Sequence, residues 1–285
     1  MRALPEASAG FPPGLHDLAD APREIFVRGG DLPAVGQAVA IVGSRAASAY
    51  GVDQARRLSG DLARMGYVIV SGLARGIDAA AHRGALEAGG RTVAVIPCGL
   101  DSITPRHHGA LAEAIAARGA LLSEWREGGP RSRGVFIQRN RLIAALTAAT
   151  VVVEAAARSG ALSTAAVATR LGRPVLAVPG DVDRETARGC HALLRRGAHV
   201  CEEAADVLSA IVHTHPQGQK TAARDGADTP EARILAVLDE VPRTVDSLAA
   251  ASGLGIPESL SALLGLRWAG AAAALPGQRW TRGRA

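Results

Sequence analysis

Residues 39–78 read VAIVGSRAASAYGVDQARRLSGDLARMGYVIVSGLARGID. Two short runs rich in β-branched residues, VAIVGS (39–44) and YVIVSG (67–72), flank a segment with helical spacing at 50–65. Apolar runs without polar alternation are typical of strands that are buried on both faces. The pattern therefore predicts a strand, a helix and a second strand parallel to the first.

The same alternation continues to residue 180 and predicts an α/β fold, a Rossmann-like parallel sheet with helices on both faces. Ligands of such sheets bind at the carboxyl ends of the strands, so candidate functional residues are sought there. The further runs are TVAVIP (92–97), ALLSEW (120–125), TVVVEA (150–155) and PVLAVPG (174–180), and a further helix is expected at 77–89.

The chain divides into four parts on composition. Residues 1–38 form an N-terminal entry segment, and 39–212 form the Rossmann-like domain. The polar, Gly- and Pro-containing stretch 213–229 is predicted to be a linker. Residues 230–285 contain three short helical segments and a probable hairpin, which together suggest a small winged-helix domain.

The expected recognition helix of that small domain, residues 257–268, carries Arg267 as its only basic residue and Glu258 opposes it. Recognition helices usually place basic or amide side chains against DNA. The composition therefore favours a protein-contact or accessory role for this module over duplex binding.

The overall composition indicates a cytoplasmic protein with an anionic partner. The formal net charge is +5, although a genome rich in G and C accounts for most of the arginine excess. No apolar run approaches the roughly 20 residues that span a bilayer, so no membrane association is expected. Cys98, Cys190 and Cys201 lie far apart without a CxxC pair, which favours free thiols over disulfides or a metal site.

Small residues follow several of the predicted strands. Glycine and serine allow backbone amides to approach a phosphate closely, and the helix that follows contributes its positive N-terminal end. In the alternative interpretation, the glycines only permit tight turns between strand and helix. Three such loops on one sheet edge favour a phosphate-binding surface. The candidate contacts are Ser71, Gly72, Gly76, Ser159, Gly160 and Thr164.

These loops match neither common nucleotide-binding motif. The first predicted strand is followed by GSRAASAYG (43–51) and not by GxGxxG, and the chain has no GxxxxGK[ST] loop. Neither NAD nor ATP is favoured, and no cofactor is expected.

The segment RSRGVFIQRNR (131–141) combines arginines with one phenylalanine, Phe136, and contains no acidic residue. Guanidinium groups suit phosphates and an aromatic ring suits an unstacked base, so the segment indicates single-stranded nucleic acid. In the alternative interpretation, Phe136 packs in the core and the arginines are solvated. The arginines are Arg131, Arg133, Arg139 and Arg141.

A catalytic set is not evident from the residues. The titratable groups near predicted strand ends show no metal-ligand spacing, and Ser159 has no neighbouring base that the sequence identifies. We therefore expect a protein that is not an enzyme. The groups considered are Asp78, His82, Asp101, His107, Glu124 and Glu154.

Taken together, the motifs resemble those of the DNA-processing (DprA/Smf) family, in the same order and over about residues 20–210. The resemblance implies a Rossmann-like domain that binds and protects single-stranded DNA and loads the RecA recombinase on it during natural transformation. It also implies a homodimer, and single-strand-binding protein is a further expected partner. The motifs are VAIVGSR, VSGLARGIDAAAH, GGRTVAVIPCGLD, FIQRNRLIAAL, VVVEAAARSGALSTA and GRPVLAVPG.

By position, the resemblance assigns strand binding to Arg45, Arg133 and Phe136. It assigns a phosphate-binding loop to Ser71, Gly72 and Arg75, and it matches Arg139 and Arg141 to the arginines of an RNR motif. Two positions depart from the family pattern: Thr104 stands where Tyr is usual before Pro105, and Ile137 stands where Pro often follows the phenylalanine.

Two other functions remain open at this point. The chain also resembles nucleoside-monophosphate phosphoribohydrolases of the cytokinin-activating (LOG) type, with a strand-end Glu and glycine-rich loops. Their expected PGGxGTxxE motif is replaced here by ARSGALSTA (157–165), which lacks the acid. A regulator of double-stranded DNA that acts through residues 230–285 is the other alternative.

Overall fold

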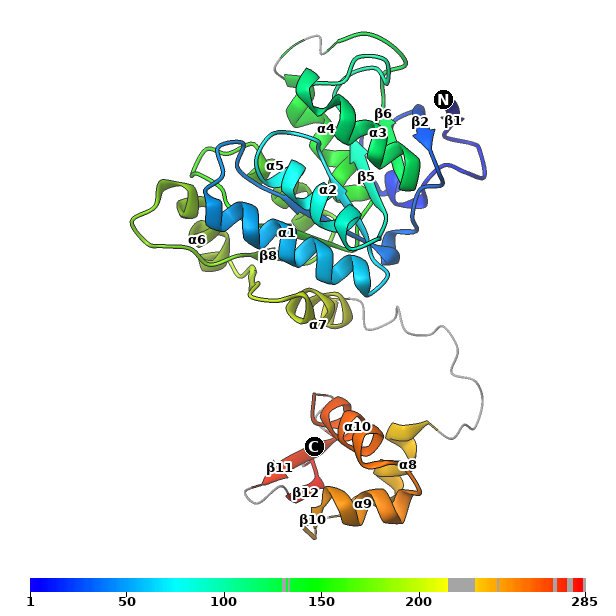
Figure 1. Cartoon of the computed structure of the whole chain (residues 1–285), viewed down its shortest axis with the longest axis vertical. Helices are drawn as coiled ribbons and strands as arrows, with labels where there is room; N and C mark the ends of the chain where they lie inside the picture. The colour runs from blue at the N-terminus through cyan, green and yellow to red at the C-terminus, as the bar shows by residue number, and fades with distance from the viewer. Residues whose placement is uncertain are drawn as a thin grey trace. The chain divides into compact units, whose positions relative to one another are not determined.

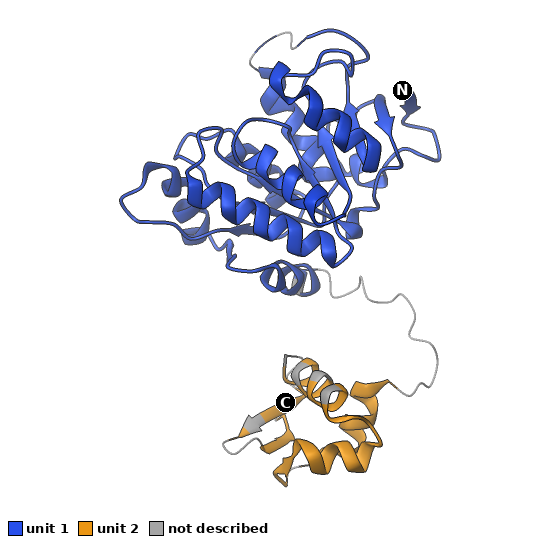
Figure 2. Cartoon of the chain, in the orientation of Figure 1, with its two compact units in different colours: residues 1–218 blue, residues 219–285 orange. Residues whose placement is uncertain are grey.

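The computed structural model describes residues 1–129, 132, 134–214, 229–239, 241–268, 271–275 and 279–283. The chain forms two compact units, residues 1–218 and residues 219–285 (Figure 2). Most of the predicted linker, residues 215–228, lies outside the described residues, whereas helix α7 (Ala204–Thr214) extends into its first two positions.

A nine-stranded sheet runs through the first unit in the order β1-β2-β6-β5-β4-β3-β7-β8-β9. All six predicted strands are present, and they lie parallel to one another. They are β3 (Ala38–Val42), β4 (Val68–Ser71), β5 (Thr92–Val95), β6 (Ala120–Ser123), β7 (Ala149–Val152) and β8 (Val175–Ala177).

Three further strands, which were not predicted, extend both edges of the sheet. Strand β2 (Glu24–Gly29) pairs antiparallel with β6, and β1 (Arg2–Pro5) pairs antiparallel with β2. Strand β9 (His199–Val200) adds to β8 at the other edge. The sheet is therefore mixed at one edge, and the entry segment belongs to the first unit.

Helices cover both faces of the sheet, as predicted, because successive residues of a strand point to opposite sides. Val39 and Ile41 of β3 pack in one cluster with residues of α1 and α2, whereas Ala40 and Val42 pack in another with residues of α4 and α5. Figure 1 shows α1 and α2 side by side over one face. The helices before α7 are α1 (Ala49–Arg64), α2 (Ile77–Glu87), α3 (Gly109–Arg118), α4 (Gly134–Ala145), α5 (Ala161–Arg170) and α6 (Arg188–Arg195).

The strand order reverses direction at β3. From β3 the chain adds β4, β5 and β6 on one side, and α4 then carries it back to β7 on the other side. The loops after β3 and β7 consequently diverge at the carboxyl edge of the sheet. This is the place at which open α/β sheets form a ligand crevice.

The second unit contains the three helices and the hairpin that were predicted. Ile234, Leu248, Leu263 and Trp280 belong to its small core. The elements are α8 (Pro230–Val237), β10 (Arg243–Thr244), α9 (Val245–Ser252), α10 (Ile256–Trp268), β11 (Ala272–Leu275) and β12 (Arg279–Arg282), and the three strands pair in the order β10-β12-β11.

The three cysteines are buried free thiols, as predicted. Within the described ranges, no group of three or more His, Cys, Asp or Glu side chains is arranged to hold a metal ion. None of the helices described is both long enough and apolar enough to cross a bilayer.

Candidate nucleic-acid interface

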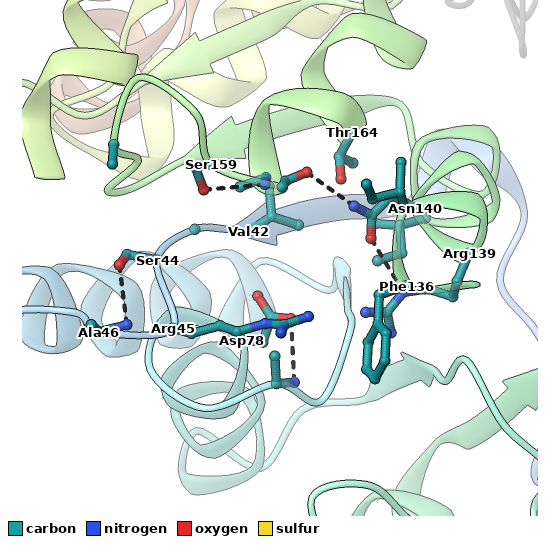
Figure 3. Close-up of a pocket in the computed structure, with 17 residues that line it drawn as sticks. Val42, Ser44, Arg45, Ala46, Asp78, Phe136, Arg139, Asn140, Ser159 and Thr164 are labelled. Carbon is teal, nitrogen blue, oxygen red and sulfur yellow. Dashed lines mark hydrogen bonds between the residues drawn. The ribbon is translucent and has the colours of Figure 1, made fainter. Parts of the chain in front are cut away.

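A pocket of about 730 Å³ opens at the point where the strand order reverses. Its walls come from the loop after β3, the first turn of α2, helix α4, and the loop that leads from β7 into α5 (Figure 3). Six of the predicted contacts line it: Arg45, Phe136, Arg139, Ser159, Gly160 and Thr164.

Arg45 and Phe136 meet at the rim of this pocket, although 91 positions separate them in the sequence. The Cζ atom of Arg45 lies 4.9 Å from the centroid of the Phe136 ring, within the range of a cation–π contact. Arg45 is exposed and Phe136 is half-buried. Phe136 therefore lies at the pocket and not in the core, and its contact with nucleic acid stays a prediction.

A close backbone contact holds the loop that carries Arg45. The carbonyl of Ser44 accepts a hydrogen bond from the amide of Ile77, with N···O 3.2 Å, and the Ser44 amide donates to the Glu154 carbonyl at 2.7 Å. Gly76 has φ +75°, and a Cβ atom there would lie 2.2 Å from the Ser44 carbonyl oxygen. Only glycine fits this position, so the SGLARG loop can pack directly against the backbone of the loop that carries Arg45.

Glu154 fixes the other end of the same loop. Its buried carboxylate accepts hydrogen bonds from the Ser48 amide at 2.9 Å and from the Ser48 hydroxyl at 2.5 Å. Ser48 is in turn the N-cap of α1, where it accepts from the amide of Gly51. A carboxylate at a helix N-terminus is stabilised by the helix dipole, so Glu154 has a structural role at the end of β7.

Arg139 lines the pocket wall, but its guanidinium is used within the protein. The side chain is buried, and it donates to the carbonyl of Gly72 at 2.7 Å and also to that of Val95. Burial lowers the pKa of Arg139 to about 10, opposed by the charge of Asp78. Burial likewise raises the pKa of Asp78, opposed by Arg139. Both side chains line the pocket, and each charge favours the ionised form of the other.

Arg141 lies away from the pocket lining and is also engaged. It donates to Asp20 at 2.7 Å and to Glu124 at 2.6 Å, and its side chain is 10% exposed. The hydroxyl of Ser71 donates to the Ile41 carbonyl at 2.6 Å inside the sheet. These two side chains, like Arg139, make their hydrogen bonds within the protein, and their assignment as DNA contacts stays a prediction.

The other predicted contacts lie in three different settings. Gly72 is buried, and a Cβ atom there would meet the Arg139 guanidinium, so this glycine makes room for the buried cation. Arg75 is exposed and lies outside the pocket lining. Arg133 lies outside the described residues, as does Arg131.

The first turn of α5 closes one wall of the pocket. The hydroxyl of Ser159 accepts from the Ala161 amide at 3.3 Å, and the Asn140 side chain donates to the Gly160 carbonyl at 3.0 Å. Thr164 is one turn further along, buried, and its hydroxyl has no hydrogen-bond partner among the described residues. The start of α5 is thus hydrogen-bonded to α4 through Asn140, and the Thr164 hydroxyl in the wall has no partner among the described residues.

The sequence did not single out the apolar part of this wall or Ser44. Val42 and Ile143 line the pocket together with Ser44, whose hydroxyl accepts from the Ala46 amide at 3.1 Å. Ser44 directly precedes Arg45 at a strand end, which is the signal that could have identified it. Val42 and Ile143 lie in apolar stretches, and nothing in the sequence distinguishes them from core residues.

His82, one of the titratable groups near the strand ends, is fully buried below this site. Its Nδ1 atom lies 2.7 Å from the Thr92 hydroxyl, which donates to the Ile69 carbonyl and so accepts from the imidazole. Burial lowers the pKa of His82 to about 3, with a further contribution from Arg139. The ring is neutral and held inside the fold, which is a structural setting.

Comparison with protein-family models gives two matches. The model of DNA recombination-mediator protein A matches residues 3–212, and that of the DprA winged helix domain matches residues 218–278. The small second unit is therefore a winged-helix domain, and the two models together cover most of the chain.

Curated relatives and solved structures agree with these matches. The chain is 44% identical to the putative DNA processing protein DprA of Mycobacterium tuberculosis over 76% of its length and 57% of that protein. It is 38% identical to protein Smf of Escherichia coli, over 92% and 72%. The chain thus spans somewhat more than half of the mycobacterial relative.

Two of the solved structures that resemble the fold are also DNA processing proteins. That of DNA processing protein A from Streptococcus pneumoniae superposes with a TM-score of 0.69 at 37% identity, covering 73% of each chain. A structure of DNA processing protein A from Helicobacter pylori, described for its single-stranded DNA binding mode, gives 0.65 at 28% identity and covers 75% of this chain and 97% of that one. With its fold and both family models in agreement, the chain belongs to the DNA-processing protein (DprA/Smf) family.

Proposed function

We propose that this protein binds single-stranded DNA at the pocket between the β3 and β7 loops, without reading its sequence. The observation that carries the proposal is the Arg45–Phe136 pair at the pocket rim. A guanidinium supplies the charge for a phosphate, and a half-buried ring supplies a face on which any base can stack. The two groups lie at one pocket, on the loop after β3 and on helix α4, so a single strand can contact both.

Cations beside the pocket support a path for the strand beyond this pair. Arg75 and Arg106 are exposed, and neither has an acidic partner in the part of the chain that the structure describes. Their loops are joined, because the Nδ1 atom of His108 donates to the Leu73 carbonyl at 2.9 Å. A backbone that leaves the pocket along the loop of Ala74 would meet these two cations.

Family membership supports the finer parts of the proposal. The Helicobacter pylori relative is described as binding single-stranded DNA, and we extend that property to this chain. Protection of incoming DNA, loading of RecA during natural transformation, a homodimer and a cytoplasmic location are proposed on the same basis. Single-strand-binding protein is the competitor that such a loader would meet.

We also propose that the protein is not an enzyme. The carboxylate of Glu154, the strand-end acid that the chain shares with phosphoribohydrolases, is engaged by Ser48 at the N-terminus of α1. His82 is buried and neutral, with its pKa lowered to about 3. Incubation with AMP should therefore release no adenine, and release above a buffer blank would contradict this part of the proposal.

The central test compares labelled oligo-dT with a duplex of equal length over a range of salt concentrations. Single-strand binding should be the tighter and should fall steeply with salt, because neutralised phosphates release counterions. RecA filament formation on strands coated with single-strand-binding protein should then rise when this protein is added. Equal affinity for duplex and single strand would overturn the proposed binding mode.

A further inference from the structure

Leu73, in the loop between β4 and α2, has a backbone conformation that non-glycine residues rarely adopt. Its φ is +57°, and no other residue besides glycines has a positive φ in the part of the chain that the structure describes. A residue with a β-carbon stays in this region only where its surroundings hold it there. The Leu73 side chain is fully buried in one apolar cluster with Ile96 and Ile115, and this packing is one of the restraints.

The second restraint is a hydrogen bond from His108 to the Leu73 carbonyl. The Nδ1 atom of the ring lies 2.9 Å from the carbonyl oxygen, and the imidazole donates because a carbonyl can only accept. His108 is 4% exposed, and its ring packs edge-on against that of His107, with the centroids 4.5 Å apart. The bond joins the 3-10 helix η3 (Arg106–His108) to a loop that lies 35 positions earlier in the chain.

Each end of this hydrogen bond lies next to an exposed arginine. Arg75 follows Leu73 by two positions, and Arg106 precedes His108 by two positions. Ala74, between Leu73 and Arg75, lines the pocket. A change of φ at Leu73 would redirect the chain that follows it, so the direction of Arg75 depends on the turn that His108 holds.

We propose that His108 is a positioning residue for strand binding. Its hydrogen bond maintains the turn at Leu73, so that Arg75 and Arg106 present their charges to the same stretch of the strand. Two cations on joined loops lose less conformational freedom on binding than two cations on independent loops, and such preorganisation raises affinity. The inference rests on the proposed binding of single-stranded DNA, and it adds a residue that acts on the strand only through others.

Two substitutions of His108 separate the hydrogen bond from the bulk of the ring. His108→Leu removes the donor, whereas the side-chain amide of His108→Asn can still donate to the Leu73 carbonyl. Oligo-dT affinity should fall about tenfold in the Leu variant, and the slope of log K against log salt should become shallower by about 0.7 to 1.4, as for one or two phosphate contacts. The Asn variant should keep most of the wild-type affinity and slope.

His82→Leu is the matched control. His82 is also a fully buried imidazole with a hydrogen bond at Nδ1, 2.7 Å from the Thr92 hydroxyl, and it does not line the pocket. Both Leu variants should melt at a lower temperature than the wild type, because each loses a buried hydrogen bond. Measured below both melting temperatures, only His108→Leu should change the salt slope of oligo-dT binding. If His108→Leu does not fold, His108→Met, with its adaptable side chain, takes its place.

A double-mutant cycle tests whether His108 acts through Arg75. Arg75→Ala should weaken oligo-dT binding in the wild-type background and have much less effect in His108→Leu, because the displaced loop no longer presents that charge. A purely structural role of His108 would instead leave the effect of Arg75→Ala the same in both backgrounds.

Three results would overturn the inference while leaving the proposed function intact. They are wild-type affinity and slope in a folded variant without the donor, equal effects of His82→Leu and His108→Leu on the slope, and a wild-type slope in both Arg75→Ala and Arg106→Ala. If the wild-type protein binds no single-stranded DNA at all, the proposed function itself fails, and the inference falls with it.

Discussion

The guanidinium carbon of Arg45 lies 4.9 Å from the centre of the Phe136 ring, and this contact joins the loop after β3 to helix α4 across the mouth of the pocket. The cation–π contact restricts the positions of both side chains. A strand that stacks a base on the face of Phe136 covered by Arg45 must move the guanidinium aside, and a phosphate can then take it as a partner. The pair therefore links the charge contact to the stacking contact.

Substitution of Arg45 by alanine should weaken oligo-dT binding by about tenfold or more, because one charge-assisted contact contributes roughly 1.5–3 kcal/mol. The slope of log K against log salt should also become shallower by about 0.7, the value for one phosphate contact on a single strand. Fluorescence anisotropy at several salt concentrations measures both quantities.

Arg64→Ala is the control for this change. Arg64 is at the last turn of the 16-residue helix α1, about 24 Å along the helix from the end near Arg45, and it pairs with Asp61. Its loss should leave affinity and slope nearly unchanged. Equal effects in the two variants would show that only overall charge matters, and would contradict the assignment of Arg45.

Substitution of Phe136 by leucine should act on the base and not on the phosphate. Loss of one stacked ring costs roughly 1–3 kcal/mol of binding free energy, whereas the salt slope should stay at its wild-type value. Phe136→Tyr keeps the ring and should keep most of the affinity. A Leu variant with a changed slope and unchanged affinity would contradict stacking at this position.

The central strands of the sheet were predictable because they are buried on both faces and therefore appear as continuous apolar runs. The edge strands carried no such signal. Strand β9 has two residues, both exposed, and β1 includes Pro5. These strands form only through pairing with neighbours that are distant in the sequence, such as Arg2 with Val27.

The site was predictable to a different degree. Arg45 and Phe136 were identified together only through the resemblance to a family, since no local pattern links positions 91 residues apart. The arginines at 139 and 141 were predicted as DNA contacts because guanidinium groups without neighbouring acids suit phosphates and because they match the RNR motif of the family. Their partners are distant in sequence: Asp20 lies 121 residues before Arg141. Charge patterning cannot reveal such distant pairs, so the sequence did not show that Arg139 and Arg141 are buried.

Substitution of Gly76 by alanine should destabilise the protein and weaken strand binding together. The new Cβ atom would lie 2.2 Å from the Ser44 carbonyl oxygen and 3.1 Å from the Arg45 backbone, so the Arg45 loop must shift. Gly89→Ala is the control, because Gly89 has nearly the same φ, +78°, with nothing within 4 Å of a Cβ atom.

The control should lose about 1 kcal/mol of stability from backbone strain alone. Gly76→Ala should lose clearly more in urea denaturation and should also bind oligo-dT less tightly. Equal losses of stability with unchanged binding would contradict the idea that this contact positions Arg45.

The pH dependence of stability should report on His82. Its pKa is lowered from 6.5 to about 3 by burial, so below pH 6.5 the unfolded chain takes up a proton that the folded protein does not. Stability should then fall as the pH drops from about 6.5 towards 3, by up to about 1.4 kcal/mol per pH unit from this group. His82→Gln can still donate to Thr92 and does not titrate, so its unfolding free energy should depend less on pH. If the unfolding free energies of the wild type and His82→Gln changed in parallel with pH, titration of His82 would not be the cause.

Removal of the winged-helix unit should leave strand binding intact. The exposed surface of α10 includes Ile256 and Leu260, with Glu258 beside them, which is a poor surface for a phosphate backbone. All described residues of the pocket belong to the first unit, which has its own core clusters. A protein of residues 1–218 should therefore bind oligo-dT within about twofold of the full chain, a difference below 0.5 kcal/mol. A tenfold loss would instead place part of the binding surface on the second unit and would favour the double-stranded-DNA alternative, which duplex binding by residues 219–285 alone would then test.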